Sequence, residues 1–229
     1  MTTKSEAVQH ALSVMAEMAG RREPYKIEVL GLQLDVLPGV FAPKYFTDSE
    51  FFAEQLPEIV GNRSFCEIGV GTGLIALKAA LGGASYVAGT DINPEAVRNT
   101  EVNFRAHGIP ITLGTGDIFD PLPEKMRFDV IFWNHPWNNV SFVPETMLQR
   151  SGLDTGYASL EKYFRYGRNR LIAGGQLLLG TGTTADLRDI YELGRKYDYA
   201  RDVIARQTTP FAQGAKRAVE LRVYSFTPR

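Results

Sequence analysis

Residues 129–137, Asp-Val-Ile-Phe-Trp-Asn-His-Pro-Trp, join an apolar run to a polar turn. A short apolar run is typical of a buried strand in a parallel sheet, and ligands of open α/β sheets bind beyond the carboxyl ends of such strands. Four candidate catalytic residues occupy this place: Asn134, His135, Pro136 and Trp137. Pro136 stiffens the turn, so the Asn134 amide is expected to project from a fixed backbone. A strand end with a turn-forming asparagine and no chemistry is the alternative.

The side chains of this turn could contact a substrate. The Asn134 side-chain oxygen can accept an N–H group, and Trp137 offers a face for stacking or for contact with a developing positive charge. His135 can hydrogen-bond a substrate, act as a base with a pKa near neutrality, or point away as a turn residue. A histidine base would suit an oxygen or an aliphatic amine better than an amide.

Residues 67–73, Glu-Ile-Gly-Val-Gly-Thr-Gly, follow a predicted strand and open a predicted helix. Glycines let the backbone approach a ligand, and a helix N-terminus contributes free N–H groups. A loop for a nicotinamide dinucleotide would need glycine at position 74, which is leucine. The pattern fits S-adenosylmethionine better, with candidate contacts at Glu67, Gly69, Gly71, Thr72 and Gly73.

Two further strand ends carry an acid followed by an isoleucine. Asp91 and Ile92 end the second strand of this series, where a carboxylate can accept both ribose hydroxyls; a helix N-cap is the alternative. Asp117 and Ile118 follow the third strand, where the acid can accept an adenine amino group and the isoleucine can flank the ring. Alone, an acid such as Asp117 would more often be a loop carboxylate. Acids at three successive strand ends, with the glycine loop first, predict an S-adenosylmethionine site.

Strand and helix patterns alternate after residue 61. The predicted strands are 64–68, 86–91, 110–114, 128–133 and 176–180, and the predicted helices are 73–82, 94–107, 159–172 and 185–197. Two late strands, near 199–206 and 218–226, follow one another and should pair antiparallel. We therefore predict an α/β fold with a Rossmann-like, seven-stranded, mostly parallel sheet and an antiparallel last strand.

The remaining segments are predicted to surround this sheet. An amphipathic helix at 5–19, which can cover the domain or contact a partner, and a β-hairpin at 27–36 form an N-terminal part, residues 1–46. Residues 47–50, Thr-Asp-Ser-Glu, have capping-box spacing and begin a helix that Pro57 should kink or end early. The connection 138–158 is long enough for a lid, with Arg150 and Asp154 as candidate readers of substrate charge, and the connection 206–217 is a second candidate wall.

The chain resembles class I S-adenosylmethionine-dependent methyltransferases, and more narrowly the branch of the release-factor glutamine methyltransferases (PrmC/HemK) and other N-methyltransferases with an Asn-Pro-Pro-Tyr motif. Residues 31–48 are similar to the family's hairpin and its Pro-Arg-x-x-Thr-Glu segment, and residues 129–137 to the strand that enters the motif. The likeness spans about residues 27–226 and implies a methyltransferase domain at 47–229.

The resemblance implies methyl transfer to a nitrogen with S-adenosyl-L-methionine as cofactor. It places cofactor contacts at residues 69–73, Asp91, Ile118 and Asn134, acceptor contacts at residues 134–137, and a segment that closes over the site at Thr47. His135 and Trp137 replace a proline and the tyrosine of the family motif, and only about one helix precedes the hairpin in place of a long helical domain. Both departures count against a release factor as the substrate.

Composition narrows the classes of partner. A net charge of −1 and a pI of about 6.3 give no general attraction for nucleic acid or an anionic membrane. The single cysteine, Cys66, cannot form an intrachain disulfide, and no Cys/His cluster has the spacing of a metal site. No apolar segment has the length of a signal peptide core or a membrane span, so a cytoplasmic location is expected.

The leading hypothesis is an S-adenosylmethionine-dependent N-methyltransferase that acts on a small amine-bearing molecule or, as second choice, on a protein side chain. One alternative is adenine-N6 methylation of RNA or DNA, which the low net charge disfavours. Another is O-methylation with His135 as the base. A cofactor-binding protein without turnover is the alternative outside the enzymes.

Overall fold

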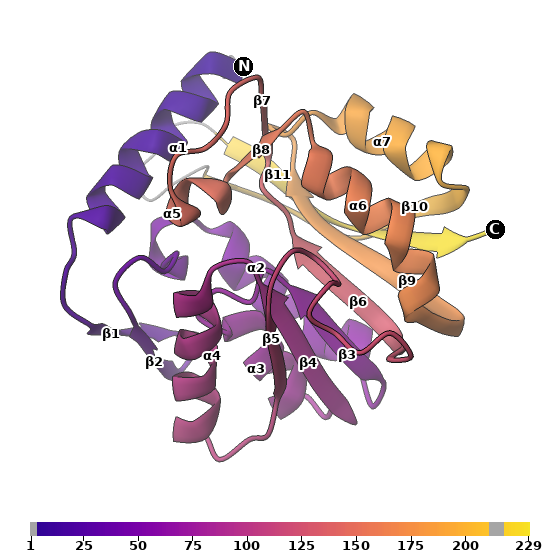
Figure 1. Ribbon diagram of the computed structural model, residues 1–229, viewed down its shortest axis with the longest axis horizontal. Helices are drawn as coiled ribbons and strands as arrows, with labels where there is room; N and C mark the ends of the chain where they lie inside the picture. The colour runs from indigo at the N-terminus through magenta and orange to yellow at the C-terminus, as the bar shows by residue number, and fades with distance from the viewer. Residues whose placement is uncertain (1–3, 211–217) are drawn as a thin grey trace.

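The computed structural model describes residues 4–210 and 218–229, and a seven-stranded sheet forms its middle layer (Figure 1). The strand order is β10-β11-β9-β6-β3-β4-β5. Pairing is parallel from β5 through β9, and β11 lies antiparallel between β9 and β10. The predicted sheet is confirmed; its strands are β3 (Ser64–Ile68), β4 (Tyr86–Asp91), β5 (Thr112–Thr115), β6 (Phe128–Asn134), β9 (Leu171–Gly182), β10 (Tyr199–Pro210) and β11 (Ala218–Pro228).

The direction of strand addition reverses at β3. From β3 the chain adds β4 and β5 toward one edge, then returns to add β6 and β9 on the other side. Asp129 and Ser64 fix the register of β3 and β6 at their start, because the Ser64 N–H donates to Asp129 Oδ2 (3.0 Å) and the Asp129 N–H donates to Ser64 Oγ (2.9 Å). A crevice at the carboxyl ends of β3 and β6 follows from this reversal.

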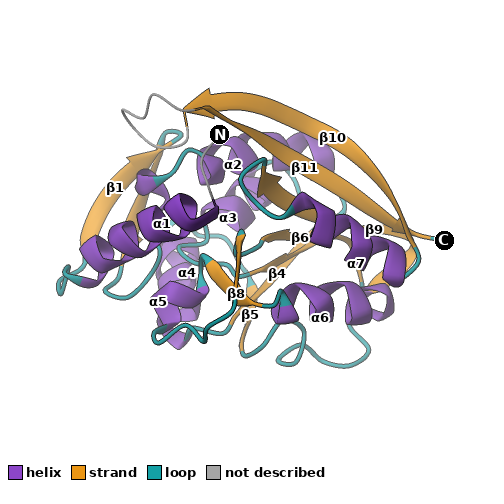
Figure 2. Cartoon of the chain, turned by 90° about the horizontal axis from the view of Figure 1, so that it is seen from above, coloured by secondary structure: helices purple, strands orange, loops and turns teal. Residues whose placement is uncertain are grey.

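Helices cover both faces of the sheet (Figures 1 and 2). On one face lie α2 (Asp48–Val60), α3 (Leu74–Leu81) and α4 (Pro94–Ala106), and on the other α6 (Ala158–Gly167) and α7 (Leu187–Lys196). Each face has its own apolar core. Phe52, Phe65 and Phe132 belong to the first core, and Tyr163 and Phe164 to the second.

The predicted hairpin is present as β1 (Tyr25–Val29) and β2 (Leu32–Val36), and it is anchored to α4. The Leu37 N–H donates to Asn99 Oδ1 (2.7 Å), and the Asp35 N–H donates to Asn103 Oδ1 (2.8 Å). Leu34 is fully buried in the core beneath α2 and α3. The hairpin therefore shares the core of the larger domain, and the division at residue 46 stays a prediction.

The N-terminal helix α1 (Lys4–Ala19) covers the domain (Figure 2). Its buried stripe has helical spacing and consists of Ala7, Ala11, Met15 and Met18, of which the last three pack with Leu148. Leu148 belongs to α5 (Met147–Arg150), which lies with the short strands β7 (Asn138–Val140) and β8 (Leu153–Thr155) in the predicted lid segment. We call α1 and α5 together the roof. No helix among the described residues is long and apolar enough to cross a membrane.

The predicted side-chain cap of α2 is wrong. Thr47 precedes the helix, but its side chain does not cap it; the Thr47 hydroxyl donates to the carbonyl of Pro210 instead (3.1 Å). Of the two outcomes predicted for Pro57, an early end is wrong, because α2 continues to Val60, and a kink stays a prediction. Leu56 and Val60 are buried in the core on either side of the proline, and their burial stabilises the last turn.

The predicted helix 159–172 also ends too late. The structure ends α6 at Gly167, and a short 3₁₀ turn (Arg168–Arg170) leads into β9. Leu171 pairs with Phe128 of β6, so the strand begins five residues before the predicted start at 176. A second 3₁₀ turn (Pro43–Tyr45) links the hairpin to α2. Most of the predicted second wall, residues 211–217, lies outside the described residues.

Candidate active site

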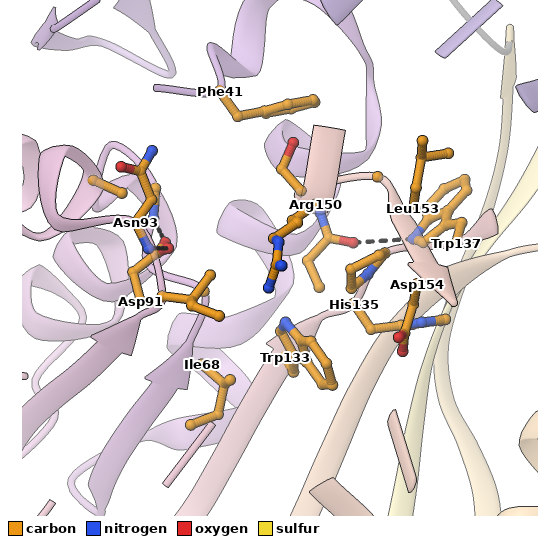
Figure 3. Close-up of a pocket in the computed structure, with 18 of the residues that line it drawn as sticks. Phe41, Ile68, Asp91, Asn93, Trp133, His135, Trp137, Arg150, Leu153 and Asp154 are labelled. Atoms are coloured by element: carbon orange, nitrogen blue, oxygen red, sulfur yellow. Dashed lines mark hydrogen bonds between the residues drawn. The ribbon is translucent and has the colours of Figure 1, made fainter. Parts of the chain in front are cut away.

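A cavity of about 350 Å³ lies at the carboxyl ends of β3, β4 and β6, under the roof (Figure 3). It brings together all the predicted cofactor and catalytic residues except Gly73. Those residues come from four separate strand ends and from the segment before α2. Their meeting is a property of the parallel sheet, whose carboxyl ends share one edge.

The glycine loop forms one wall of the cavity. Gly69, Gly71 and Gly73 have φ values of +69°, +54° and +81°, which side chains rarely adopt. A Cβ at Gly71 would meet no atom within 4 Å, so the backbone there is open for the close approach of a ligand. At Gly73 a Cβ would lie 2.8 Å from Thr100 Cγ2, which shows that this glycine allows α3 and α4 to pack.

Asp91 at the end of β4 is held by backbone groups. Its Oδ2 accepts from the Gly71 N–H (3.0 Å), and its Oδ1 accepts from the Asn93 N–H (2.8 Å). Desolvation raises the pKa of Asp91 to about 6, although these hydrogen bonds lower it. The N-cap of α4 is Asn93, whose side chain accepts from the Glu95 N–H (3.1 Å). Asp91 is therefore not the helix cap, and its carboxylate faces the cavity beside the glycine loop (Figure 3).

Glu67 lies below the loop and is almost fully buried. Its Oε2 accepts from the Ala76 N–H (2.8 Å), and burial raises the pKa of its carboxyl well above the ordinary value. This hydrogen bond joins the end of β3 to the first turns of α3. Glu67 therefore supports the loop while it also lines the cavity.

Asp117 and Ile118 form the wall beyond β5. The Asp117 carboxylate makes an ion pair with Lys162 of α6 and raises the pKa of that lysine. Ile118 is buried and has φ +48°, an unusual value for a β-branched residue, and its carbonyl accepts from the Thr90 hydroxyl (2.7 Å). Strained residues of this kind cluster at binding sites. Ile118 thus presents an apolar surface to the cavity at a fixed position.

Asn134 ends β6, and its amide orientation is set by two partners. The Asn134 Nδ2 donates to Asp48 Oδ2 (2.8 Å), and its Oδ1 accepts from the Trp137 Nε1–H (3.1 Å). A carboxylate only accepts and an indole only donates, so the two contacts agree on one orientation. Burial raises the pKa of Asp48, although the hydrogen bond from Asn134 lowers it. The Asn134 oxygen keeps one lone pair, and the residue lines the cavity.

His135 and Trp137 are integrated into the packing around the turn. His135 is 1% exposed, its Nε2 lies 3.1 Å from Thr181 Oγ1, and its ring packs edge-on against Tyr157. Desolvation lowers the pKa of His135 to about 3, so the ring is neutral at physiological pH. A Cβ at Gly182 would lie 2.5 Å from the Trp137 ring, so this glycine makes room for the indole. Pro136, which separates His135 from Trp137 in the sequence, is buried.

The two residues of the lid segment that were predicted to contact charged groups of the substrate, Arg150 and Asp154, differ in role. Asp154 is buried and accepts from the Ser159 and Leu160 N–H groups (3.1 and 3.0 Å), which places it at the N-terminus of α6. That position explains the residue without a substrate. Arg150 is exposed, lines the cavity, and reaches into it with its guanidinium group (Figure 3).

The sequence did not single out Asp48, and it predicted the helix at 5–19 without showing that its apolar face lines the cavity. Asp48 approaches Asn134 across 86 positions of sequence, a contact that no local pattern reveals. Its place directly after Thr47, in the segment similar to Pro-Arg-x-x-Thr-Glu, was the available signal. The roof residues that line the cavity, Ala7, Ala11, Met15 and Leu148, carry a helical pattern that identifies a buried face but not what it covers.

The donor set suits S-adenosylmethionine. Carboxylates line the cavity near the glycine loop, the loop offers an open backbone at Gly71, and Ile118 provides an apolar face. The carboxylates match ribose hydroxyls and the cationic sulfur and amine groups, the open backbone admits a ligand at close range, and the apolar face matches a flat base.

Two similar proteins carry names of glutamine methyltransferases. A protein of Methanocaldococcus jannaschii with the provisional name protein N5-glutamine methyltransferase is 38% identical over 111 residues, 48% of this chain and 54% of that one. The release factor glutamine methyltransferase of Geobacter sulfurreducens is 30% identical over 161 residues, 62% of this chain and 54% of that one. The chain thus spans about half the length of these relatives.

Solved structures share the fold. The T. thermophilus 16S rRNA N2 G1207 methyltransferase, crystallised with AdoMet and guanosine, has a TM-score of 0.64 at 22% identity over 90% of this chain and 50% of that one. The ribosomal protein L11 methylase of Lactobacillus delbrueckii has a TM-score of 0.54 at 18% identity over 77% and 76% of the two chains. The family model of the methyltransferase small domain matches residues 31–205, and the chain belongs to this family.

Proposed function

We propose that this chain transfers a methyl group from S-adenosylmethionine to a side-chain nitrogen of a protein, with the glutamine amide as the first choice. The contact between Asn134 and Asp48 carries the proposal, because it fixes the Asn134 oxygen as an acceptor at the end of β6. The names of the relatives from M. jannaschii and G. sulfurreducens favour this acceptor over the small amine expected from the sequence. A cytoplasmic location stays a prediction.

The residues of the turn would act on the acceptor by positioning it. An amide nitrogen is a weak nucleophile because its lone pair is delocalised. A hydrogen bond from its N–H to Asn134 Oδ1 would hold it in line with the methyl group that the bound cofactor supplies. Trp137, itself bonded to Asn134, would cover the acceptor and exclude water. Each of these contacts contributes about 0.5–2 kcal/mol.

The state of His135 argues against its action as the base for a hydroxyl acceptor. An alcohol needs a base with a pKa near the working pH to remove its proton, and burial holds the pKa of His135 at about 3. The ring also uses one nitrogen toward Thr181. Its contribution is then to pack beneath the turn against Trp133 and Tyr157.

Incubation with labelled S-adenosylmethionine tests the proposal. Glutamine-containing proteins should gain one methyl group, located by mass spectrometry on the amide. Asn134→Ala should lower kcat by about tenfold or more and leave the Kd of S-adenosylhomocysteine within about threefold, because the lost contact acts on the acceptor. Label found only in small molecules or nucleic acid would refute the protein substrate.

A further inference from the structure

We propose that Arg150 binds the carboxylate at the amino-acid end of the cofactor, so that the roof contributes a polar contact to cofactor recognition. The proposal rests on S-adenosylmethionine as the cofactor of the proposed function. It adds a residue from the lid segment to a site otherwise built from the ends of the sheet strands.

The charges of the cavity single out Arg150. Among the described residues that line it, the side-chain carboxylates are those of Asp48, Glu67, Asp91, Asp117 and Asp154, and the only lysine or arginine is Arg150. S-adenosylmethionine is largely cationic at its sulfonium and ammonium groups and carries a single carboxylate. A cavity rich in acids therefore suits most of the cofactor but needs one cation for that carboxylate.

The acids of the cavity already have partners within the chain. Asp117 pairs with Lys162, Asp48 accepts from Asn134, and Asp154 accepts from the start of α6. Asp91 and Glu67 accept backbone N–H groups of Gly71 and Ala76. Within the described chain, Arg150 makes no ion pair with any of them. Its guanidinium is therefore available to a ligand.

The backbone at Arg150 is held in place on both sides. Before it, Leu148 is buried against α1, and the Thr146 hydroxyl accepts from the Gln149 N–H (3.1 Å). After it, the Gly152 carbonyl accepts from Asn138 Nδ2 (2.9 Å), and a Cβ at Gly152 would lie 2.3 Å from Met15 Cε. The side chain is thus directed into the cavity from a fixed point, between Asp91 and Trp133 in Figure 3.

Arginine is suited to this contact. Its guanidinium is planar and can form two parallel hydrogen bonds with a carboxylate, which lysine cannot reproduce. Because α5 packs on α1, a carboxylate bound by Arg150 would also stabilise the closed roof. A carboxylate on the acceptor could use the same chemistry, so the experiment must separate the two sources.

The proposal is tested by calorimetry, which measures the Kd of two ligands for each of four proteins. The ligands are S-adenosylhomocysteine and its decarboxylated analogue, S-adenosyl-3-thiopropylamine, which keeps the amine. The proteins are wild type, Arg150→Met, Arg150→Lys and the control Arg105→Met, which removes an exposed arginine of α4 paired with Glu101. Thermal melts establish that each variant is folded.

Arg150→Met should raise the Kd of S-adenosylhomocysteine about tenfold to a hundredfold and leave the decarboxylated analogue unchanged. The Kd of S-adenosylhomocysteine for Arg150→Lys should lie between the values for wild type and Arg150→Met. The Kd for Arg105→Met should equal that of wild type. Equal losses for both ligands, or no loss for either, would overturn the proposal. An unchanged Kd with a raised KM for a glutamine-containing protein would assign Arg150 to the acceptor and overturn it too. A wild-type protein that binds neither ligand would instead refute the proposed function.

Discussion

At the scale of single residues, the site depends on carboxylates in unusual environments. Asp91, Glu67 and Asp48 all have raised pKa values because they lie in a desolvated cavity, yet each accepts a hydrogen bond that favours its charge. Such perturbed groups are typical of functional sites. The pKa of Asp91 lies in a pH range where cofactor binding can be measured. At Asp48, substitution by asparagine removes the charge but keeps the hydrogen-bond acceptor, so the two contributions can be separated.

Cofactor affinity should depend on pH through Asp91. The pKa of Asp91 is raised to about 6, so below that pH the carboxyl is protonated and accepts ribose hydroxyls poorly. We expect the Kd of S-adenosylhomocysteine to rise about tenfold for each pH unit below 6 and to be flat above it. Asp91→Ala should bind about 2–4 kcal/mol more weakly at pH 7.5, with no step near pH 6. Calorimetry from pH 5 to 8 measures both, and a step retained in the variant would assign the titration to another group.

Asp48 should act through the orientation of Asn134. Asp48→Asn keeps an oxygen that can accept from Asn134 Nδ2, whereas Asp48→Ala removes it. We expect near-normal turnover for Asp48→Asn and at least a tenfold lower kcat for Asp48→Ala, with unchanged cofactor affinity. Equal turnover in the two variants would show that Asp48 does not position Asn134.

The raised pKa of Asp48 also sets the sign of its effect on stability. Its neutral form is favoured in the folded state, so wild type loses stability as pH rises from below the ordinary value through the raised one. Asp48→Asn has no such loss. Its Tm should therefore equal or exceed that of wild type at pH 8, whereas the difference should shrink at pH 4.

At the scale of elements, the glycine loop combines two demands on the backbone. Gly69 and Gly73 have close neighbours in Trp133 and Thr100, whereas Gly71 faces open space in the cavity. Gly69 thus allows β6 to pack close to the loop, Gly73 does the same for α4, and Gly71 admits a ligand.

A pair of alanine substitutions separates strain from binding. Gly71 (φ +54°) and Gly108 (φ +67°) both have left-handed backbone and no atom within 4 Å of a Cβ, but only Gly71 lines the cavity. Alanine should cost about 1–2 kcal/mol of folding stability at either position. Only Gly71→Ala should weaken the binding of S-adenosylhomocysteine. Matched losses of stability with normal binding in both would contradict contact at Gly71.

The strands β3 and β4 could be predicted from sequence because each is a compact apolar run followed by a helix signal. The strands 64–68 and 86–91 match their predicted bounds. Short elements held by tertiary contacts could not: α5 has four residues, and β7 and β8 have three each. Local capping signals also failed at Thr47, since Pro210 offered its hydroxyl a partner from a distant strand. The strand-end positions of the site were predictable, but contacts such as Asp48 to Asn134 were not.

At the scale of the whole molecule, two distant segments complete the site. Helix α1 begins at residue 4 and α5 at residue 147, yet they pack together above the cavity (Figure 2). The rim near α5 is apolar, with Phe142, Val143 and Met147 exposed. An apolar rim beside a cavity that contains several carboxylates favours a partner that presents a side chain from a folded surface. This arrangement agrees with a protein acceptor better than with an extended polyanion.

Salt dependence distinguishes the two classes of acceptor. The chain has a net charge of −1, and among the described residues that line the cavity Arg150 is the only lysine or arginine, so few phosphates could be neutralised near the acceptor position. An arginine-rich hollow formed by Arg188, Arg195, Arg201 and Arg229 shares no lining residue with the cavity. We expect the KM for a glutamine-containing protein to change less than about threefold between 50 and 200 mM salt. A nucleic acid bound through 6–10 phosphates would lose about 10³–10⁵ in affinity over that range. Steady-state kinetics at four salt concentrations makes the comparison, with Arg201→Met as the control for the hollow. A steep loss of acceptor affinity with salt, with a slope that Arg201→Met lowers by about one, would show that a polyanion binds there and carries the acceptor to the site.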